Sequence, residues 1–294
     1  MSLAGPAGQS AMTIASPPMD PTTRDALLRW LGLDGAPATD LAGLQALHRA
    51  YATRVPFEAL EAQLGTWGPL DPPALARRLL GGRGGYCFEV NTVLHDLLAA
   101  IGFAVVRHEA LVGPRERHGW GDPPDHLTLV VQLPDDGPFI ADAGLGAGLI
   151  EPIPLREGHF QAGPFHADLA RDGDGWWVGL HELAGMPGFR FSDAPATLDA
   201  FQPHHARMSG SEDSPFVRTL VVQRPAADHI TTLRARTLSI VGPDRREQRV
   251  VDGPEDFAAA LARLGVDPEA LGPERLARLW ARACAQHEAF VRER

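Results

Sequence analysis

The sequence predicts an α+β fold in which helices come first, strands follow, and strands and helices share the C-terminal part. Apolar residues repeat at helical spacing through about the first hundred residues. Short apolar or alternating runs between turn residues then predict strands, and helical patterns return near the C-terminus. Because helices and strands are segregated along the chain, we expect no alternating, doubly wound parallel sheet.

The N-terminal helices are recognised by their ends. Helices favour Ser, Thr, Asp or Pro at the start and glycine after the last turn. The expected helices run from Asp20-Pro21 to Gly32, from Thr39 or Asp40 onward, from Asp71-Pro72 to Gly81, and from Cys87 to Gly102. Residues 1–19 are small, aperiodic and rich in Pro and Gly, and we expect a disordered tail there.

The strands are expected after Gly102, with lengths and spacing typical of an antiparallel sheet or a small barrel. The predicted strands are residues 103–107, 127–133, 139–142, 176–180, 217–223 and 237–241. Two more helices are expected over residues 254–264 and 273–290.

Composition and charge exclude several classes of protein. The 294 residues have a formal net charge of −10, with no lysine, so nucleic acid is not an expected partner. No apolar stretch has the roughly 18 residues of a membrane span, and the N-terminus lacks a secretory signal. Two cysteines, Cys87 and Cys284, make neither a disulfide framework nor a multi-cysteine zinc site. We therefore expect no membrane contact, no metal and a cytoplasmic location.

The most unusual segment is residues 81–91, GGRGGYCFEVN. Four glycines in five positions are conformationally costly, and the run ends where Cys87 opens a helix. The unpaired N–H groups and the dipole at a helix start favour a thiolate, so we expect a lowered pKa for this thiol. The alternative is that Cys87 is a small buried apolar residue in a glycine-rich turn.

A base and its orienting group are predicted in one hairpin. In residues 126–133, HLTLVVQL, the leucines share one strand face and His126 lies on the other. A tight loop over residues 134–138 would join this strand to the next, which ends at Asp142, and bring the carboxylate beside the imidazole. Taken singly, His126 could be a surface histidine and Asp142 a turn residue. Because both residues occur in one hairpin downstream of Cys87, the three together suggest a nucleophile (Cys87), a base (His126) and an orienting group (Asp142).

Four segments together resemble the arylamine N-acetyltransferase family. They are residues 55–60 (VPFEAL), residues 83–89 (RGGYCFE), His126 before an apolar strand, and residues 142–146 (DAGLG). The second string is the most specific, and the similarity is weak beyond about residue 160. The resemblance assigns the catalytic cysteine, histidine and aspartate of the family to Cys87, His126 and Asp142.

The resemblance implies a helical bundle, a central antiparallel β-barrel and a C-terminal α/β lid, with a papain-like arrangement of the cysteine triad. The implied bundle, with the nucleophile, is residues 20–102, the barrel, with the histidine and aspartate, is residues 103–205, and the lid is residues 206–294.

The resemblance also implies contacts with coenzyme A. They would be made by Gly144, Leu145, Gly146, Phe57 and Phe216, with the N–H groups of the loop near the diphosphate. The alternative is that the glycines shape a hairpin and the phenylalanines belong to the core. Exposed arginines such as Arg218 and Arg224 are interpreted as solvated surface. Glu89 is expected to form a structural salt bridge with Arg83.

The chain departs from the family pattern at four positions. Ala59 stands where the family commonly has Asn, and Ala143 and Leu145 stand where it has Val and Phe. Asp125 precedes the histidine in place of a common Thr. These changes leave the triad intact and affect the choice of acceptor.

The implied activity is ping-pong transfer of an acetyl group from acetyl-CoA, through an acetyl-cysteine, to an arylamine, arylhydrazine or N-hydroxyarylamine. Such an enzyme acts in xenobiotic metabolism. An amide synthase that closes a polyketide macrolactam would use the same triad, and a Cys-His-Asp peptidase or a transglutaminase-like enzyme has the same residue order. A non-enzymatic binding module would not need the thiol. The oligomeric state is left open, with a homo-oligomer as one option.

Overall fold

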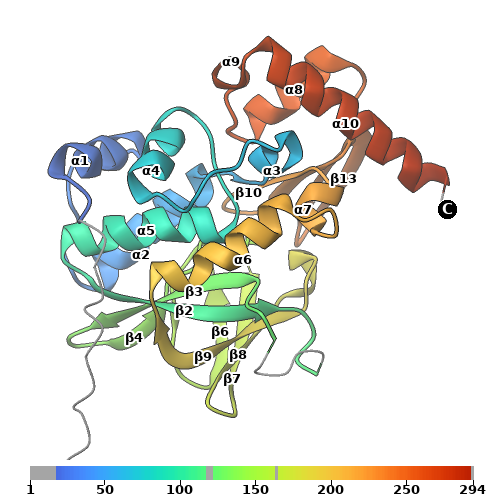
Figure 1. The fold of residues 1–294 in the computed structure, drawn as a ribbon. Helices are drawn as coiled ribbons and strands as arrows, with labels where there is room; N and C mark the ends of the chain where they lie inside the picture. Colours follow the sequence, from blue (N-terminus) through green and yellow to red (C-terminus); the bar gives the residue numbers. More distant parts are fainter. Residues whose placement is uncertain (1–17, 117–121, 163–164, 293–294) are drawn as a thin grey trace, which may run out of the picture.

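A computed structural model of the chain describes residues 18–116, 122–162 and 165–292. Residues 1–17 of the predicted tail lie outside the described residues. The observed architecture is α+β, with helices, an eight-stranded antiparallel sheet and a second, five-stranded sheet with its own helices, which confirms the predicted fold class (Figure 1). None of the helices in the described part of the chain is long and apolar enough to cross a membrane.

The N-terminal part contains five helices and one short strand. They are α1 (Pro21–Trp30), α2 (Leu41–Arg54), β1 (Phe57–Glu58), α3 (Leu60–Leu64), α4 (Pro72–Leu80) and α5 (Cys87–Ile101). The predicted caps are confirmed at Asp20 and Asp40, whose carboxylates accept the N–H groups of Thr23 and Gly43. Gly102 ends α5 in the left-handed region, at φ 115°, where glycine is favoured.

The eight-stranded sheet curls into a barrel. Its strands are β2 (Ala104–Val112), β3 (His126–Leu133), β4 (Gly137–Ile140), β5 (Ile153–Pro154), β6 (Gly158–Ala162), β7 (Phe165–Asp172), β8 (Gly175–Leu180) and β9 (Gly188–Ala196). They pair in the order β5-β4-β3-β2-β9-β8-β7-β6, and the two edge strands, β5 and β6, come into contact. One short 3₁₀ turn, η1 (Glu182–Ala184), lies between β8 and β9.

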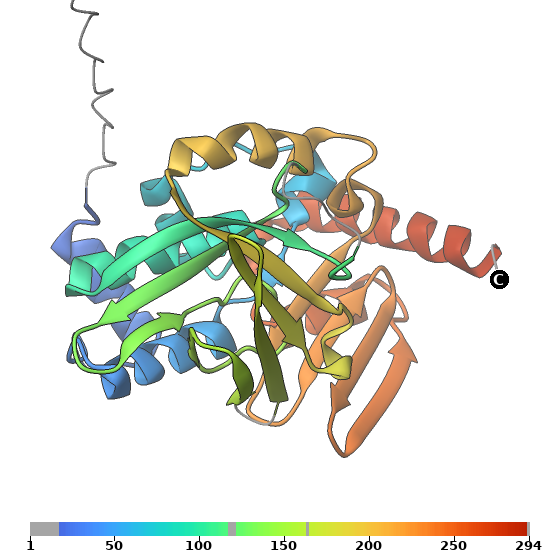
Figure 2. The ribbon, with the colours of Figure 1, turned by 90° about the horizontal axis from the view of Figure 1, so that it is seen from below.

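Two helices, α6 (Leu198–Gly210) and α7 (Pro215–Arg218), connect the barrel to the C-terminal part, which we call the lid. The lid consists of four strands and three helices. They are β10 (Val221–Pro225), β11 (Ile230–Arg234), β12 (Thr237–Gly242), β13 (Arg245–Val250), α8 (Pro254–Arg263), α9 (Pro268–Leu271) and α10 (Pro273–Arg292). Its sheet has the order β1-β10-β11-β12-β13, so the N-terminal β1 contributes its first strand. Seen from below, the lid sheet stands beside the barrel (Figure 2).

One local prediction was wrong, and one helix was missed. Residues 217–223 were expected to be one strand, but Val217 lies in α7 and β10 begins at Val221. Ser214 accepts the N–H of Phe216 and Pro215 occupies the first helical position, so a capped turn of helix forms there. The helix α6 was not predicted, because Pro203 interrupts its pattern.

Three apolar cores hold these parts together. One fills the space between the N-terminal helices and the leucine face of β3, a second fills the barrel, and the third lies between the lid sheet and α8 and α10. α5 crosses β3 within the first core, which places the first residue of that helix beside the first residue of the strand. The predicted division at residue 205 falls inside α6, and the boundaries of the three parts stay a prediction.

Candidate active site

The turn before α5 is built by close backbone contacts. Glu58 N donates to Gly85 O at 2.9 Å and Gly85 N donates to Pro56 O at 3.3 Å, so the glycine run lies beside the first strand of the lid sheet. A side chain at Gly84 would begin 1.8 Å from Pro56 O, and only glycine leaves room for this approach. The glycines therefore serve close packing, and they bring Cys87 to a fixed position at the start of α5.

Buried ion pairs hold this turn. Glu89 pairs with Arg78 at 2.8 Å and accepts the N–H of Tyr86 at 3.1 Å. The expected pair of Glu89 with Arg83 was wrong, because Arg83 instead pairs with Glu58 at 2.8 Å. Both arginines are needed, since a carboxylate buried without a partner is strongly destabilising.

The hairpin of β3 and β4 brings the histidine and the aspartate together. The two strands pair with Val130 opposite Ile140, and Ala141 N donates to Leu129 O at 2.9 Å, so the chain continues along β3 to Asp142. His126 Nε2 and Asp142 Oδ2 are 2.7 Å apart, and the two side chains are 1% and 0% exposed. The predicted contact between these two residues is present.

Cys87 lies against the same imidazole. The thiol lies close enough to His126 for each group to shift the pKa of the other, and Sγ donates to the backbone oxygen of Asp125 at 3.5 Å. Because Nε2 of the ring is hydrogen-bonded to Asp142, Nδ1 is the ring nitrogen that is left to interact with the thiol. The three side chains thus form a chain from the sulfur through the ring to the carboxylate, which is the order that nucleophilic catalysis requires.

The electrostatics of the three groups are dominated by burial and by each other. Desolvation opposes a charge on His126, but the Asp142 carboxylate and the neighbouring sulfur outweigh it and raise the pKa of the imidazole to about 10. Burial also disfavours the Asp142 anion, yet His126, Asn91 and Gly144 hold its pKa below the usual value. These groups favour a protonated ring, the state that follows transfer of the thiol proton.

The expected lowering of the Cys87 pKa was wrong. Burial raises the pKa of this thiol, and the hydrogen bond and charge of His126 only partly oppose that rise. A helix start lowers a thiol pKa where the sulfur is solvated, but here the sulfur is closed off from water, with Cys87 3% exposed. Activation therefore rests on proton transfer to His126.

Asn91 is a part of the site that the sequence reasoning missed. Its Nδ2 donates to Asp142 Oδ1 at 2.8 Å and to Leu127 O at 2.7 Å, and its Oδ1 accepts the N–H of Ala143 at 3.2 Å. It therefore fixes the carboxylate from the side opposite the ring. The signal was its spacing, because a residue four positions after Cys87 lies on the same helix face.

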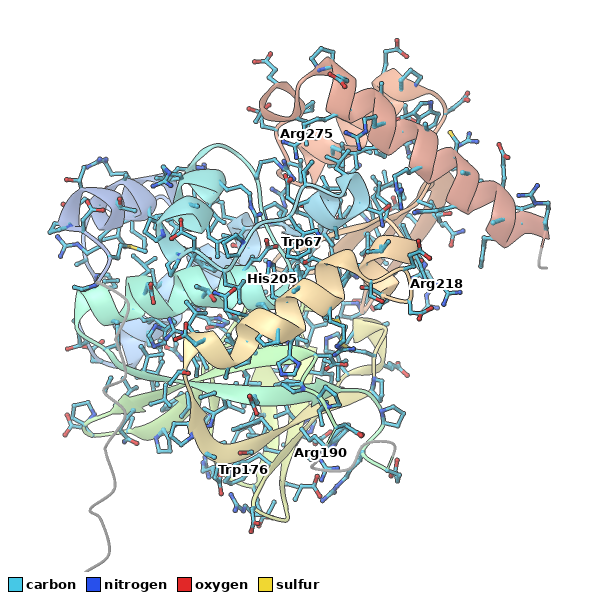
Figure 3. All side chains as sticks on the ribbon, in the orientation of Figure 1. Trp67, Trp176, Arg190, His205, Arg218 and Arg275 are labelled. Carbon is cyan, nitrogen blue, oxygen red and sulfur yellow. The ribbon has the colours of Figure 1, made fainter. Side chains whose placement is uncertain are left out.

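A second missed feature supports the residue before the nucleophile. The hydroxyl of Tyr86 contacts His205 Nδ1 at 2.6 Å and Ser209 at 3.1 Å, both on α6. His205 Nε2 in turn lies 2.7 Å from Gly68 O, to which it donates, so Nδ1 is left to accept from the tyrosine. Figure 3 shows His205 close to Trp67, whose ring meets it edge-on at 5.8 Å.

The residues predicted to contact coenzyme A fall into two groups. Phe57, Gly146 and Phe216 are brought together, since the Phe57 and Phe216 rings are 6.0 Å apart and a side chain at Gly146 would meet Phe57 at 2.8 Å. Leu145 is instead 4% exposed and belongs to the barrel core. The N–H of Gly144 donates to Asp142 at 2.8 Å, so it is not available to a diphosphate.

The departure at Asp125 has a local explanation. Its carboxylate accepts the N–H of Val112 at 2.8 Å, which ties it to the end of β2. Its charge also disfavours the Cys87 thiolate.

Within the described residues, no group of three or more His, Cys, Asp or Glu side chains is arranged to hold a metal ion.

The fold and this site define a class of protein: a three-part α+β scaffold that brings a cysteine, a histidine and an aspartate together in one buried site. Residues 40–264 match a family model described as N-acetyltransferase. The chain is 31% identical over 252 residues to an arylamine N-acetyltransferase of Mycolicibacterium smegmatis, covering 81% of this chain and 89% of that protein. It belongs to the arylamine N-acetyltransferase family.

Solved structures agree with this membership. A variant of the M. smegmatis enzyme superposes with a TM-score of 0.80 at 29% identity, covering 89% of this chain and 98% of that one. The Mycobacterium marinum arylamine N-acetyltransferase in complex with CoA superposes with a TM-score of 0.79 at 25% identity, covering 88% of this chain and 97% of that one. The resemblance inferred from the sequence motifs is confirmed.

Proposed function

We propose that this enzyme transfers an acetyl group from acetyl-CoA to an arylamine, an arylhydrazine or an N-hydroxyarylamine, with Cys87 as the nucleophile, His126 as the base and Asp142 as its orienting partner. The single observation that carries the assignment is the buried chain of contacts from the sulfur through the imidazole to the carboxylate. Membership of the arylamine N-acetyltransferase family supports the donor and the acceptor class.

In the first half-reaction His126 holds the proton of the thiol, and the sulfur attacks the thioester carbonyl as a thiolate. The imidazolium is stabilised by Asp142, which is held in turn by Asn91. The N–H of Cys87, at the first position of α5, has no partner inside the helix and is therefore a candidate donor to the developing oxyanion. Collapse of the adduct breaks the bond to the coenzyme sulfur, which takes the proton from His126.

In the second half-reaction the amine attacks the acetyl-cysteine. His126 takes a proton from the nitrogen, the carbon–sulfur bond breaks, and the Cys87 thiol is regenerated. An arylamine is a weak base and is unprotonated at neutral pH, so the enzyme does not have to deprotonate an ammonium ion first. The half-buried ring of Phe216, 4.7 Å from that of Tyr86, offers an aromatic wall beside the nucleophile.

Two-substrate kinetics test the proposal. We expect parallel double-reciprocal lines for acetyl-CoA and p-anisidine, the pattern of a ping-pong reaction. Cyclohexylamine, which is protonated at neutral pH, is the matched control and should not accelerate release of coenzyme A. Intersecting lines, or equal acceleration by the two amines, would overturn the proposal.

The macrolactam and peptidase alternatives gain no support from the geometry. A macrolactam synthase needs room for a large acyl chain, but the cavity beside Leu145 and Asp142 is only about 10 Å³. Leu145 thus leaves no room for a large acyl chain at that point.

Location and assembly are further proposals. Cys87 and Cys284 are both free thiols, which supports a reducing cytoplasm. A homo-oligomer is tested by sedimentation velocity.

A further inference from the structure

His48 is a buried histidine that the proposed mechanism does not use. It lies on α2 and is 1% exposed. Within the described part of the chain, neither of its ring nitrogens has a hydrogen-bond partner. A neutral imidazole carries one N–H donor and one acceptor, and burial of both without partners is destabilising. An apolar side chain of similar size would avoid this cost, so packing alone does not account for a histidine at this position.

The imidazole of His48 faces the loop that begins at Asp142. Ala52, one helical turn after His48, borders the same small cavity as Asp142 and the loop that follows it. Residues four positions apart lie on the same face of a helix, so His48 faces this loop too. At the far end of the loop, Arg49 Nε lies 2.6 Å from Glu151 Oε1. The loop is therefore packed along one side of α2.

The backbone groups close to the imidazole belong to the two ends of this loop. Burial lowers the pKa of His48, which keeps the ring neutral at neutral pH. The peptide groups of Ile150 and Asp142, and the charges of Asp142 and Glu151, oppose this shift. A peptide group favours a protonated ring through its carbonyl oxygen, so the ring lies between the backbone oxygens of Asp142 and Ile150.

The opposite side of the loop faces the nucleophile. A side chain at Gly144 would begin 2.9 Å from the Cα atom of Cys87 and 2.6 Å from Nδ2 of Asn91, both on α5. Asn91 also donates to the carboxylate of Asp142 at 2.8 Å. Asp142 thus lies between two helices, with its carboxylate fixed by α5 and its backbone against α2.

We propose that His48 is a positioning residue of the triad, which supports the backbone at Asp142 from α2 and acts through Asp142 on the orientation of His126. The inference rests on the proposed function, in which His126 needs a fixed carboxylate. His126 and Asp142 meet at 2.7 Å with both side chains buried, so a displacement of the loop changes this contact directly. Misplacement of a catalytic group by about 1 Å can lower a rate about 100-fold.

A double-mutant cycle tests the proposal. His48→Leu removes both ring nitrogens, and we expect it to slow acylation of Cys87 by acetyl-CoA about tenfold. In the Asp142→Asn background the same substitution should change the rate by about twofold or less, because a positioning residue has no effect once the group that it positions is lost. Single-turnover acylation, followed by intact mass, measures all four rates.

Equal effects of His48→Leu in the two backgrounds would overturn the proposal, since a loss of packing acts independently of Asp142. An unchanged rate in the single variant would overturn it as well. If His48→Leu does not fold, as judged by circular dichroism, His48→Phe takes its place with the same expected results. That variant keeps a planar ring and lacks both nitrogens.

The pH dependence of Cys87 alkylation by iodoacetamide is a second readout, and it needs no acetyl donor. His48→Leu should move the midpoint of this profile upward by about one pH unit, the equivalent of tenfold, because a misaligned carboxylate stabilises the protonated His126 less. Leu47→Ala is the matched control. Leu47 is fully buried on the same helix, so its truncation destabilises the fold and should leave the midpoint unchanged.

An equal shift of the midpoint in His48→Leu and Leu47→Ala would mark a general effect of lost stability and would overturn the proposal. Failure of the wild-type protein to form an acyl-cysteine would instead refute the proposed function. The alkylation profiles would still decide the role of His48 in that case, because they report the Cys87 and His126 pair directly.

Discussion

The helices α5 and α10 each carry one of the two cysteines, and their surroundings differ. Eleven of the fifteen residues of α5 are buried, against two of the twenty residues of α10. The buried residues of α5 include Glu89, Asn91 and Asp96, and each has a polar or charged partner. The comparison teaches that the groups fixed around a thiol decide whether it has the partners that a nucleophile needs, as Cys87 does on α5.

The largest effect on acetyl transfer should come from replacing one of the two cysteines, Cys87, by alanine, with the same replacement of Cys284 for comparison. Cys87→Ala should lower acetyl transfer about a millionfold, the loss seen when a triad nucleophile is removed. Cys284→Ala is the matched control on half-buried α10 surface and should keep the rate within about twofold. Steady-state rates with acetyl-CoA and an arylamine measure both, and circular dichroism checks the fold. Substantial activity in Cys87→Ala would remove the nucleophile from the account.

The next effect tests the partner of the base. Asp142→Asn should slow acyl-enzyme formation about 10⁴-fold, because the ring loses the carboxylate that selects its tautomer and stabilises its charge. Asp168→Asn is the control. Asp168 also contacts a histidine, His159, at 2.8 Å, but both of these side chains are 62% exposed. Stopped-flow release of coenzyme A measures the step. Equal effects of the two substitutions would contradict a special role for the buried pair.

A third comparison uses the two ends of one ion network. Glu61 pairs with Arg83 next to the glycine turn and with Arg275 on α10, which is labelled in Figure 3. Arg83 is 5% exposed, so Arg83→Gln should reduce the free energy of unfolding by about 3–5 kcal/mol. Arg275 is 33% exposed, and Arg275→Gln should cost about 1 kcal/mol or less. Urea unfolding would contradict the account if the order were reversed.

The smallest effect concerns pH. The folded-state pKa of His126 is raised to about 10, so its pairing with Asp142 stabilises fully below about pH 6.5 and less as pH rises towards 10. The lowered pKa of Asp142 means that its contribution is present above about pH 4 and is lost in acid. The stability difference between wild type and Asp142→Asn should therefore shrink by about 1 kcal/mol or more between pH 6.5 and 9.5. Urea titrations at the two pH values measure it, and a constant difference would contradict the assignment.

Local patterns predicted the elements that carry the chemistry. The start of α5 followed from the glycine run and the apolar repeat after Cys87. The alternation of β3 and the turn after it predicted the hairpin that aligns His126 with Asp142. These features depend on residues that are close together in the sequence, so local patterns are enough to predict them.

Features that depend on distant partners were missed or wrong. The partner of Glu89 is Arg78 and not Arg83, because the turn directs Arg83 toward Glu58. The helix dipole suggested a lowered pKa for Cys87, but the desolvation that raises it comes from packing. The contact of α2 with the loop after β4 could not be predicted either, since the two segments are far apart in the sequence.

Intact-mass spectrometry after mixing the wild-type protein with acetyl-CoA, without an acceptor, tests the central claim most directly. The account predicts a gain of one acetyl group, mapped by peptide digestion to the fragment that contains Cys87, and its loss when an arylamine is added. An unmodified protein, or an acetyl group on Cys284, would contradict it.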